Sequence, residues 1–183
     1  PLLGMENPLT ITQILWVNLV MDTLAALAFG GEPALKRYMQ EAPKRRDEPI
    51  VNKYMWSQIL TSSIWIFLLS MMLLVSHWAD GFFREGPADF ANMYLMTGYF
   101  AFFIFAAVFN GFNARTEQMN LFDNIGKNKG FLRIMGLIAL VQVIITYVGG
   151  EILRGYGLVV SEWVFVILLA FTVIPVDLIR KAI

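Results

Sequence analysis

The chain has 183 residues, of which 57% are hydrophobic and 15% are charged, whereas an ordinary soluble domain has about 25% charged residues. Its 14 basic and 14 acidic residues cancel, so net charge gives no reason to expect nucleic-acid binding. The absence of Cys excludes disulfides, thiolate metal sites and Cys nucleophiles. This composition predicts an integral membrane protein in contact with lipid.

Five segments are long and apolar enough to cross a membrane, which takes about 20 residues of helix. In the first of them, Thr10 and Gln13 have the spacing of a capping box. We therefore expect an all-α fold, a polytopic membrane bundle of five transmembrane helices within a single region, residues 1–183. The predicted spans are residues 10–30, 54–78, 91–112, 131–149 and 162–179.

The basic residues predict an orientation. Residues 31–53 contain six Lys or Arg, residues 113–133 contain four and the C-terminal residues contain two, whereas only Arg84 and Arg154 lie on the other side. The positive-inside rule then makes the loops 31–53 and 113–130 and the C-terminus cytoplasmic, with the N-terminus outside.

The opening "PLLGMENPLT" has neither an initiator Met nor a basic segment before an apolar run. Together with an N-terminus outside the cell, this predicts that the chain is the C-terminal part of a larger membrane protein and that earlier transmembrane segments precede it.

Asp22 is the acidic residue in the middle of a predicted span, where a carboxylate costs roughly 2.5–3.5 kcal/mol on insertion scales. Asn18 precedes it by four residues, so both side chains project from one helix face. Amide and carboxylate oxygens are ligands that Ca²⁺ takes, six to eight at a time. We expect Asn18 and Asp22 to be metal ligands completed by other helices; a structural hydrogen bond to a neighbouring helix is the alternative.

Two other ionisable residues are expected to be interfacial. Asp177 lies near the end of the fifth span, four residues before Lys181, which is the spacing of an ion pair on a helix. His77, the only His, lies beside Trp78 at the outer end of the second span.

Three stretches resemble P-type calcium ATPases, in particular the plasma-membrane calcium pumps. "LWVNLVMDTLAALAFGGEP" is similar to their sixth transmembrane helix and "RYMQEAPKRRDEPIV" to the basic loop that follows it. "VFNGFNARTEQMNLFDNIGKNKGF" is similar to the segment after their eighth helix. The resemblance covers nearly the whole chain and implies that its five spans are helices six to ten.

By this resemblance, Asn18 and Asp22 fall on calcium ligands of helix six. Met21 and Ala107 fall where two-calcium pumps have further ligands, and neither a thioether nor a methyl group suits a hard cation. The resemblance therefore implies export of one Ca²⁺ per cycle, with a Glu and backbone carbonyls of helix four completing the shell. It also places Arg45 and Arg46 at the phosphorylation domain, although basic residues there can equally serve topology.

The chain has no "DKTG" phosphorylation motif and no P-loop, so it offers no catalytic or cofactor-binding residue. ATP and Mg²⁺ would be used by preceding cytoplasmic domains of the same parent chain. The short tail and compact outer loops favour a plasma membrane, specifically a bacterial inner membrane.

Other functions stay open. A Mn²⁺ pump or a Ca²⁺/Mn²⁺ P-type pump would share the Asn-x-x-Met-Asp pattern, but such pumps usually continue with Gly-Pro-Pro, where this chain has Thr23, Leu24 and Ala25. A cation channel or secondary carrier would place Asp22 in a permeation path, although the paired repeats common in carriers are not evident. A purely structural membrane subunit would leave Asp22 unexplained.

Overall fold

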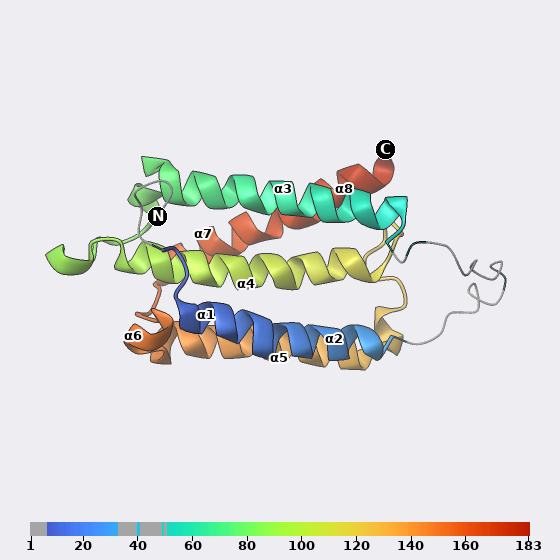
Figure 1. The fold of residues 1–183 in the computed structure, drawn as a ribbon, viewed down its shortest axis with the longest axis horizontal. Coiled ribbons are helices and arrows are strands. Elements are labelled where there is room, and N and C mark those ends of the chain that lie inside the picture. The colour runs from blue at the N-terminus through green and yellow to red at the C-terminus, as the bar shows by residue number, and fades with distance from the viewer. Residues whose placement is uncertain (1–6, 33–39, 41–48, 50) are drawn as a thin grey trace.

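The computed structural model of the chain describes residues 7–32, 40, 49 and 51–183, apart from the side chains of His77 and Asp89. Within these residues, five long helices run side by side (Figure 1). The expected contact of Arg45 and Arg46 and the expected interfacial position of the His77 side chain lie outside the described residues.

The all-α fold with five long apolar helices is confirmed, each helix having 20 or 23 residues. Two of the five are interrupted, the first by a π turn and the fifth by a break at Thr172. Their bounds are α1 Ile11–Trp16, η1 Val17–Met21 and α2 Asp22–Gly30 for the first; α3 Lys53–Val75; α4 Met93–Arg115; α5 Lys129–Val148; and α7 Val160–Phe171 with α8 Val173–Ala182 for the fifth. Short helical turns occupy the connections: η3 His77–Phe82, η4 Ala88–Phe90, η5 Ile125–Lys127 and α6 Gly150–Leu153.

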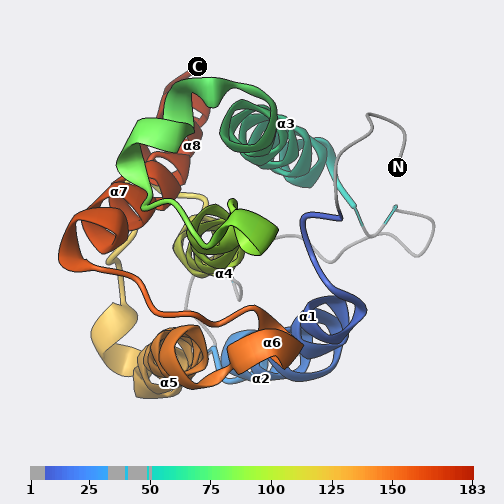
Figure 2. The ribbon, with the colours of Figure 1, turned by 90° about the vertical axis from the view of Figure 1, so that its left-hand side faces the viewer.

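Helix α4 is the centre of the bundle, and the other four spans surround it (Figure 2). In its most apolar stretch 61% of the residues are buried, against 17% to 33% in the other spans. Its sequence "MYLMTGYFAFFIFAAVFNGFNAR" is apolar on every side, as expected of a helix enclosed by others. Small residues allow close approach: a Cβ on Gly98 would lie 2.2 Å from the ring of Phe83.

Two apolar clusters flank α4. One joins α4 to α3, α7 and α8. The other, which we call the α4–α5 cluster, joins α4 and α5 to the first span. Its buried members are Met21 and Ala28 of the first span, Phe100, Ile104 and Val108 of α4, and Phe131, Met135, Ile138 and Ile145 of α5.

Local hydrogen bonds from side chains close the N-termini of several helices. The expected capping box is confirmed: Gln13 N donates to Thr10 Oγ1 at 3.1 Å, and Thr10 N donates to Gln13 Oε1 at 2.8 Å. Asn52 caps α3 by accepting from Met55 N, and Asn128 caps α5 by accepting from Phe131 N, both at 2.8 Å. At the start of α7 the carboxylate of Glu162 accepts from Val159 N at 2.8 Å. These bonds satisfy amides that a helix start leaves free.

The fifth span breaks at Thr172 because Pro175 has no N–H to donate to the carbonyl four residues earlier. The Thr172 hydroxyl donates to Leu169 O at 2.7 Å and accepts from the indole of Trp65 at 2.9 Å. One residue further, Val173 O accepts from Asn113 Nδ2 of α4 at 3.0 Å. The break is therefore held by polar contacts from two neighbouring helices.

The expected ion pair of Asp177 and Lys181 is confirmed, with Lys181 Nζ 3.1 Å from Asp177 Oδ2. Both side chains are only 1% exposed, so the pair is buried between helices; its expected position at the membrane interface stays a prediction. Arg180 Nε also donates to Asp177 Oδ1 at 2.7 Å. Lys181 donates to Asn113 O and Thr116 O at the end of α4, because the last carbonyls of a helix attract a cation.

Candidate ion-binding site

Asn18 lies in a π turn, η1, in the middle of the first span, and Asp22 directly follows this turn as the first residue of α2. Here the Asp22 N–H donates to Val17 O, five residues back, instead of to the carbonyl four residues back. A π turn holds more residues than the 3.6 of an α turn, so two side chains four residues apart project in nearly the same direction. Such turns are frequent at functional sites.

The two faces of the π turn differ. The side chains of Asn18 and Asp22 are exposed on the outside of the five-helix bundle. Met21, which directly precedes Asp22, is 8% exposed and belongs to the α4–α5 cluster. The π turn therefore presents oxygen donors away from the bundle and an apolar anchor into it.

The resemblance implies lost ligands at Met21 and Ala107, and both residues lie at the α4–α5 cluster. Both belong to or pack against the α4–α5 cluster, whose other members are apolar. Met21 packs among these side chains, whereas Asn18 and Asp22 are exposed.

Asn18 and Asp22 are two donors, short of the six to eight oxygens of a calcium shell. Among the described residues, no three His, Cys, Asp or Glu side chains come together as a metal cluster. The neighbouring Thr23 hydroxyl already donates to Leu19 O at 2.6 Å within the helix.

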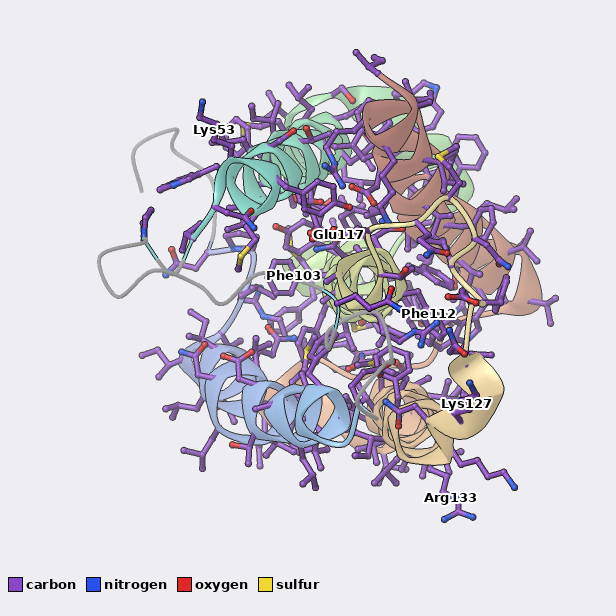
Figure 3. The ribbon with its side chains drawn as sticks, turned by 90° about the vertical axis from the view of Figure 1, so that its right-hand side faces the viewer. Lys53, Phe103, Phe112, Glu117, Lys127 and Arg133 are labelled. Carbon is purple, nitrogen blue, oxygen red and sulfur yellow. The ribbon has the colours of Figure 1, made fainter. Side chains whose placement is uncertain are left out.

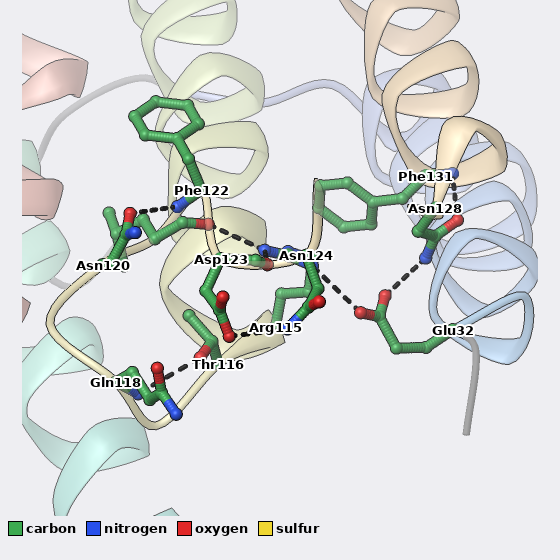
Figure 4. A network of polar contacts seen from close by, with 11 residues as sticks. Glu32, Arg115, Thr116, Gln118, Asn120, Phe122, Asp123, Asn124, Asn128 and Phe131 are labelled. Carbon is green, nitrogen blue, oxygen red and sulfur yellow. Dashed lines mark hydrogen bonds and ion pairs between the residues drawn. The ribbon is translucent and has the colours of Figure 1, made fainter. Parts of the chain in front are cut away.

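The first span is attached to its neighbours at both ends. At its start, Gln13 is fully buried and its Nε2 donates to Leu153 O in α6 at 2.8 Å. Just beyond its end, the Glu32 carboxylate accepts from Arg115 Nη1 at 2.9 Å and from Asn128 Nδ2 (Figure 4). The π turn lies between these two attachments.

Arg115 connects three parts of the structure at that end (Figure 4). Its guanidinium donates to Glu32, to Leu121 O at 2.9 Å and to Asp123 O, and it lies 5.8 Å from the ring centroid of Phe131. The Arg115 side chain is 2% exposed and Glu32 is 23% exposed. Since Arg115 ends α4 and Phe131 lies in α5, this network joins the end of α2 to both helices.

The same end of the bundle carries exposed basic residues. Lys53 begins α3, and Lys127 and Arg133 flank the start of α5 (Figure 3). Lys127 and Arg133 are exposed. These residues belong to the basic segments from which a cytoplasmic side was predicted. The orientation itself stays a prediction.

The opposite end has a second ionic contact that was not predicted from the sequence. Arg84 donates from Nε to Glu162 Oε1 at 3.0 Å and from its backbone N to the same oxygen at 3.0 Å. This hydrogen bond to Glu162 raises the pKa of Arg84 above its ordinary value. The guanidinium also lies 4.0 Å from the ring centroid of Tyr94, so the contact ties the connection between α3 and α4 to the start of α4 and to α7.

Comparison with known proteins agrees with this architecture. The family described as "Cation transporting ATPase, C-terminus" matches residues 6–183. Calcium-transporting ATPase 9, plasma membrane-type, from Arabidopsis thaliana is 34% identical over 183 residues, which cover 97% of this chain and 16% of that protein. Calcium-transporting ATPase PAT1 from Dictyostelium discoideum is 31% identical with the same coverage, 97% and 16%. A plasma membrane-type calcium-transporting ATPase 10 from Oryza sativa subsp. japonica is 34% identical over 95% of this chain and 17% of its own length.

The chain thus spans about a sixth of the length of these relatives. The family match extends over all five long helices, including the π turn with Asn18 and Asp22. The resemblance read from the sequence is confirmed: this chain belongs to the cation-transporting ATPases and corresponds to their C-terminal transmembrane region.

Proposed function

We propose that this chain is the ion-binding and translocation part of an ATP-driven calcium pump, in which Asn18 and Asp22 are oxygen ligands. The observation that carries the proposal is the π turn, which presents an amide and a carboxylate together at mid-span on the outer face of the bundle. A carboxylate at that depth needs a partner. A bound divalent cation supplies one.

The remaining ligands come from preceding transmembrane helices of the same parent chain, packed against the exposed face of the π turn. ATP and Mg²⁺ act in preceding cytoplasmic domains. The names of the relatives support calcium as the transported ion. The plasma membrane-type relatives support a plasma membrane location. The positive-inside rule supports a cytoplasmic position for the basic end of the bundle.

A stoichiometry of one Ca²⁺ per cycle is supported by the α4–α5 cluster. A second site in this region would need oxygen donors near Met21 and Ala107. Those positions instead carry a thioether and a methyl group within an apolar cluster, which disfavours a hard cation. Both Asn18 and Asp22 then serve a single ion.

The test is phosphoenzyme formation from ATP by the full-length protein, with Ca²⁺ and Mn²⁺ titrated separately. Wild type should be phosphorylated in a Ca²⁺-dependent manner, and Asp22→Asn should need at least about 10-fold more Ca²⁺, since loss of a ligand removes its charge from the shell. Thr23→Val, next to Asp22 but bonded only within its own helix, is the control and should keep the wild-type Ca²⁺ requirement.

Equal Ca²⁺ requirements in wild type and Asp22→Asn would show that Asp22 is not a ligand. Phosphorylation supported at lower concentration by Mn²⁺ than by Ca²⁺ would favour a manganese pump. Ion flux without phosphorylation would favour a channel or carrier.

A further inference from the structure

The buried face of α5 is apolar except at Gln142 and Thr146, which lie one turn apart. Phe131, Met135, Ile138 and Ile145 of this face are all buried in the α4–α5 cluster. Gln142 has the helical spacing of the same face and is 1% exposed. A primary amide is thus enclosed at a position where its helix otherwise packs apolar side chains against α4 and the first span.

Counting along the helices from two fixed contacts places Gln142 near the level of the π turn. The first span and α5 run side by side in opposite directions (Figures 1 and 2). At one end Gln13 bonds to Leu153, and at the other the rings of Phe29 and Phe131 lie 5.7 Å apart between centroids. Counted from these two contacts, Gln142 falls at about the same level along the bundle as η1. Met21 of η1 packs into the α4–α5 cluster.

The amide of Gln142 is poorly satisfied. Its Oε1 has no hydrogen-bond partner among the described residues, and its Nε2 lies at the long distance of 3.4 Å from Thr146 Oγ1. Thr146 in turn donates to Gln142 O, as a helical Thr does without help. A buried polar group of this kind calls for an explanation, because an apolar side chain of equal size would avoid the cost of burial.

A π turn offers the missing partner when it rearranges. Conversion between π and α hydrogen bonding moves backbone N–H and C=O groups from one partner to another, and at membrane depth no water replaces the lost bond. An amide can both donate and accept, so it can satisfy either kind of freed group.

We propose that Gln142 is a positioning residue for the ion site: its amide becomes the hydrogen-bond partner of the π-turn backbone when η1 rearranges. Gln142 is buried within the bundle, whereas Asn18 and Asp22 are exposed, so its route to the ion runs through the backbone of the turn. The inference rests on the proposed function, since it assigns the rearrangement to ion binding.

The experiment compares full-length wild type with Gln142→Met, Ile138→Met and Asp22→Asn. Met has nearly the length of Gln without its polar atoms, and Ile138→Met places the same side chain one turn away on the same face. For each protein we would measure the melting temperature in detergent and the Ca²⁺ concentration for half-maximal phosphoenzyme.

Gln142→Met should melt at or above the wild-type temperature, because it no longer buries an unpaired amide. It should nevertheless need about 10-fold more Ca²⁺, the size of effect typical of a lost supporting contact behind a metal ligand. Ile138→Met should keep the wild-type Ca²⁺ requirement.

A lower melting temperature or a failure to fold in Gln142→Met would overturn the inference, because the amide would then be a packing contact. An unchanged Ca²⁺ requirement would also overturn it. Asp22→Asn separates the two proposals: if it shifts the Ca²⁺ requirement and Gln142→Met does not, only the role of Gln142 fails. If wild type is not phosphorylated in response to Ca²⁺, the proposed function fails and this inference fails with it.

Discussion

The carboxylate that fastens the end of the first span should be a major source of stability. Glu32 accepts from Arg115 at 2.9 Å, and the Arg115 side chain is 2% exposed. Removing one partner of a fully buried ion pair costs about 3–5 kcal/mol, because the remaining charge stays buried without compensation. Glu32 is 23% exposed, so solvent screens part of the interaction and we expect Glu32→Gln to cost about 2–3 kcal/mol.

A double-mutant cycle with Arg115→Met isolates the pair from the other bonds of Arg115. Glu32→Gln, Arg115→Met and the double variant would be unfolded reversibly in mixed micelles with increasing SDS. We expect a coupling energy of about 1–3 kcal/mol. Arg133→Met, which removes an exposed basic side chain from the same end of the bundle, should stay within about 0.5 kcal/mol of wild type. A coupling energy below about 0.5 kcal/mol would refute the reasoning and show that the loop carbonyls alone hold Arg115.

Two further predictions concern packing and the second ionic contact. Gly98→Ala should cost about 1–3 kcal/mol, because the new methyl would lie 2.2 Å from the buried ring of Phe83. Gly136→Ala, whose new methyl would have no atom within 4 Å, should instead gain about 0.4–1 kcal/mol; equal effects in the same unfolding assay would contradict the packing argument. Arg84→Gln should cost about 3 kcal/mol and Glu162→Gln less, because Glu162 is 1% exposed and Arg84 is 44% exposed, so only the guanidinium reaches water when its partner is lost. The opposite order would contradict this explanation.

The helices could be predicted because their signals are local. Apolar length marks all five, and the capping pair of Thr10 and Gln13 marks the start of the first within one residue. The spacing of Asp177 and Lys181 likewise predicted their ion pair. The burial of that pair depends on which helices surround it, and spacing along one helix carries no information about that.

The interruptions of two helices were not predicted. Pro175 is a local signal for the break at Thr172, and attention to its missing N–H would have placed it. The π turn at Val17–Met21 has no comparable signal, because none of its residues is a helix breaker. Its inner face is defined by α4 and α5, which are distant in sequence.

The candidate site was only partly predictable. The mid-span position and four-residue spacing of Asn18 and Asp22 predicted them as ligands, and the family resemblance pointed to the same pair. The structure adds the π turn between them and the burial of the adjacent Met21. The bonds that hold the first span, from Gln13 to Leu153 and from Glu32 to Arg115, join residues 140 and 83 positions apart. Only the folded arrangement brings such residues together.

The central position of α4 has a consequence for biosynthesis. Two of its buried polar side chains find partners that are translated much later: Thr97 Oγ1 bonds to Arg154 O, 57 residues on, and Asn113 bonds to Val173 O, 60 residues on. Until α7 and α8 have been made, α4 lies in the membrane with the Asn113 amide unpaired and its apolar, small-residue faces uncovered, whereas Thr97 can already donate to Met93 O of its own helix. Chaperone contacts with the nascent chain should therefore concentrate on α4 and end when α8 has been made.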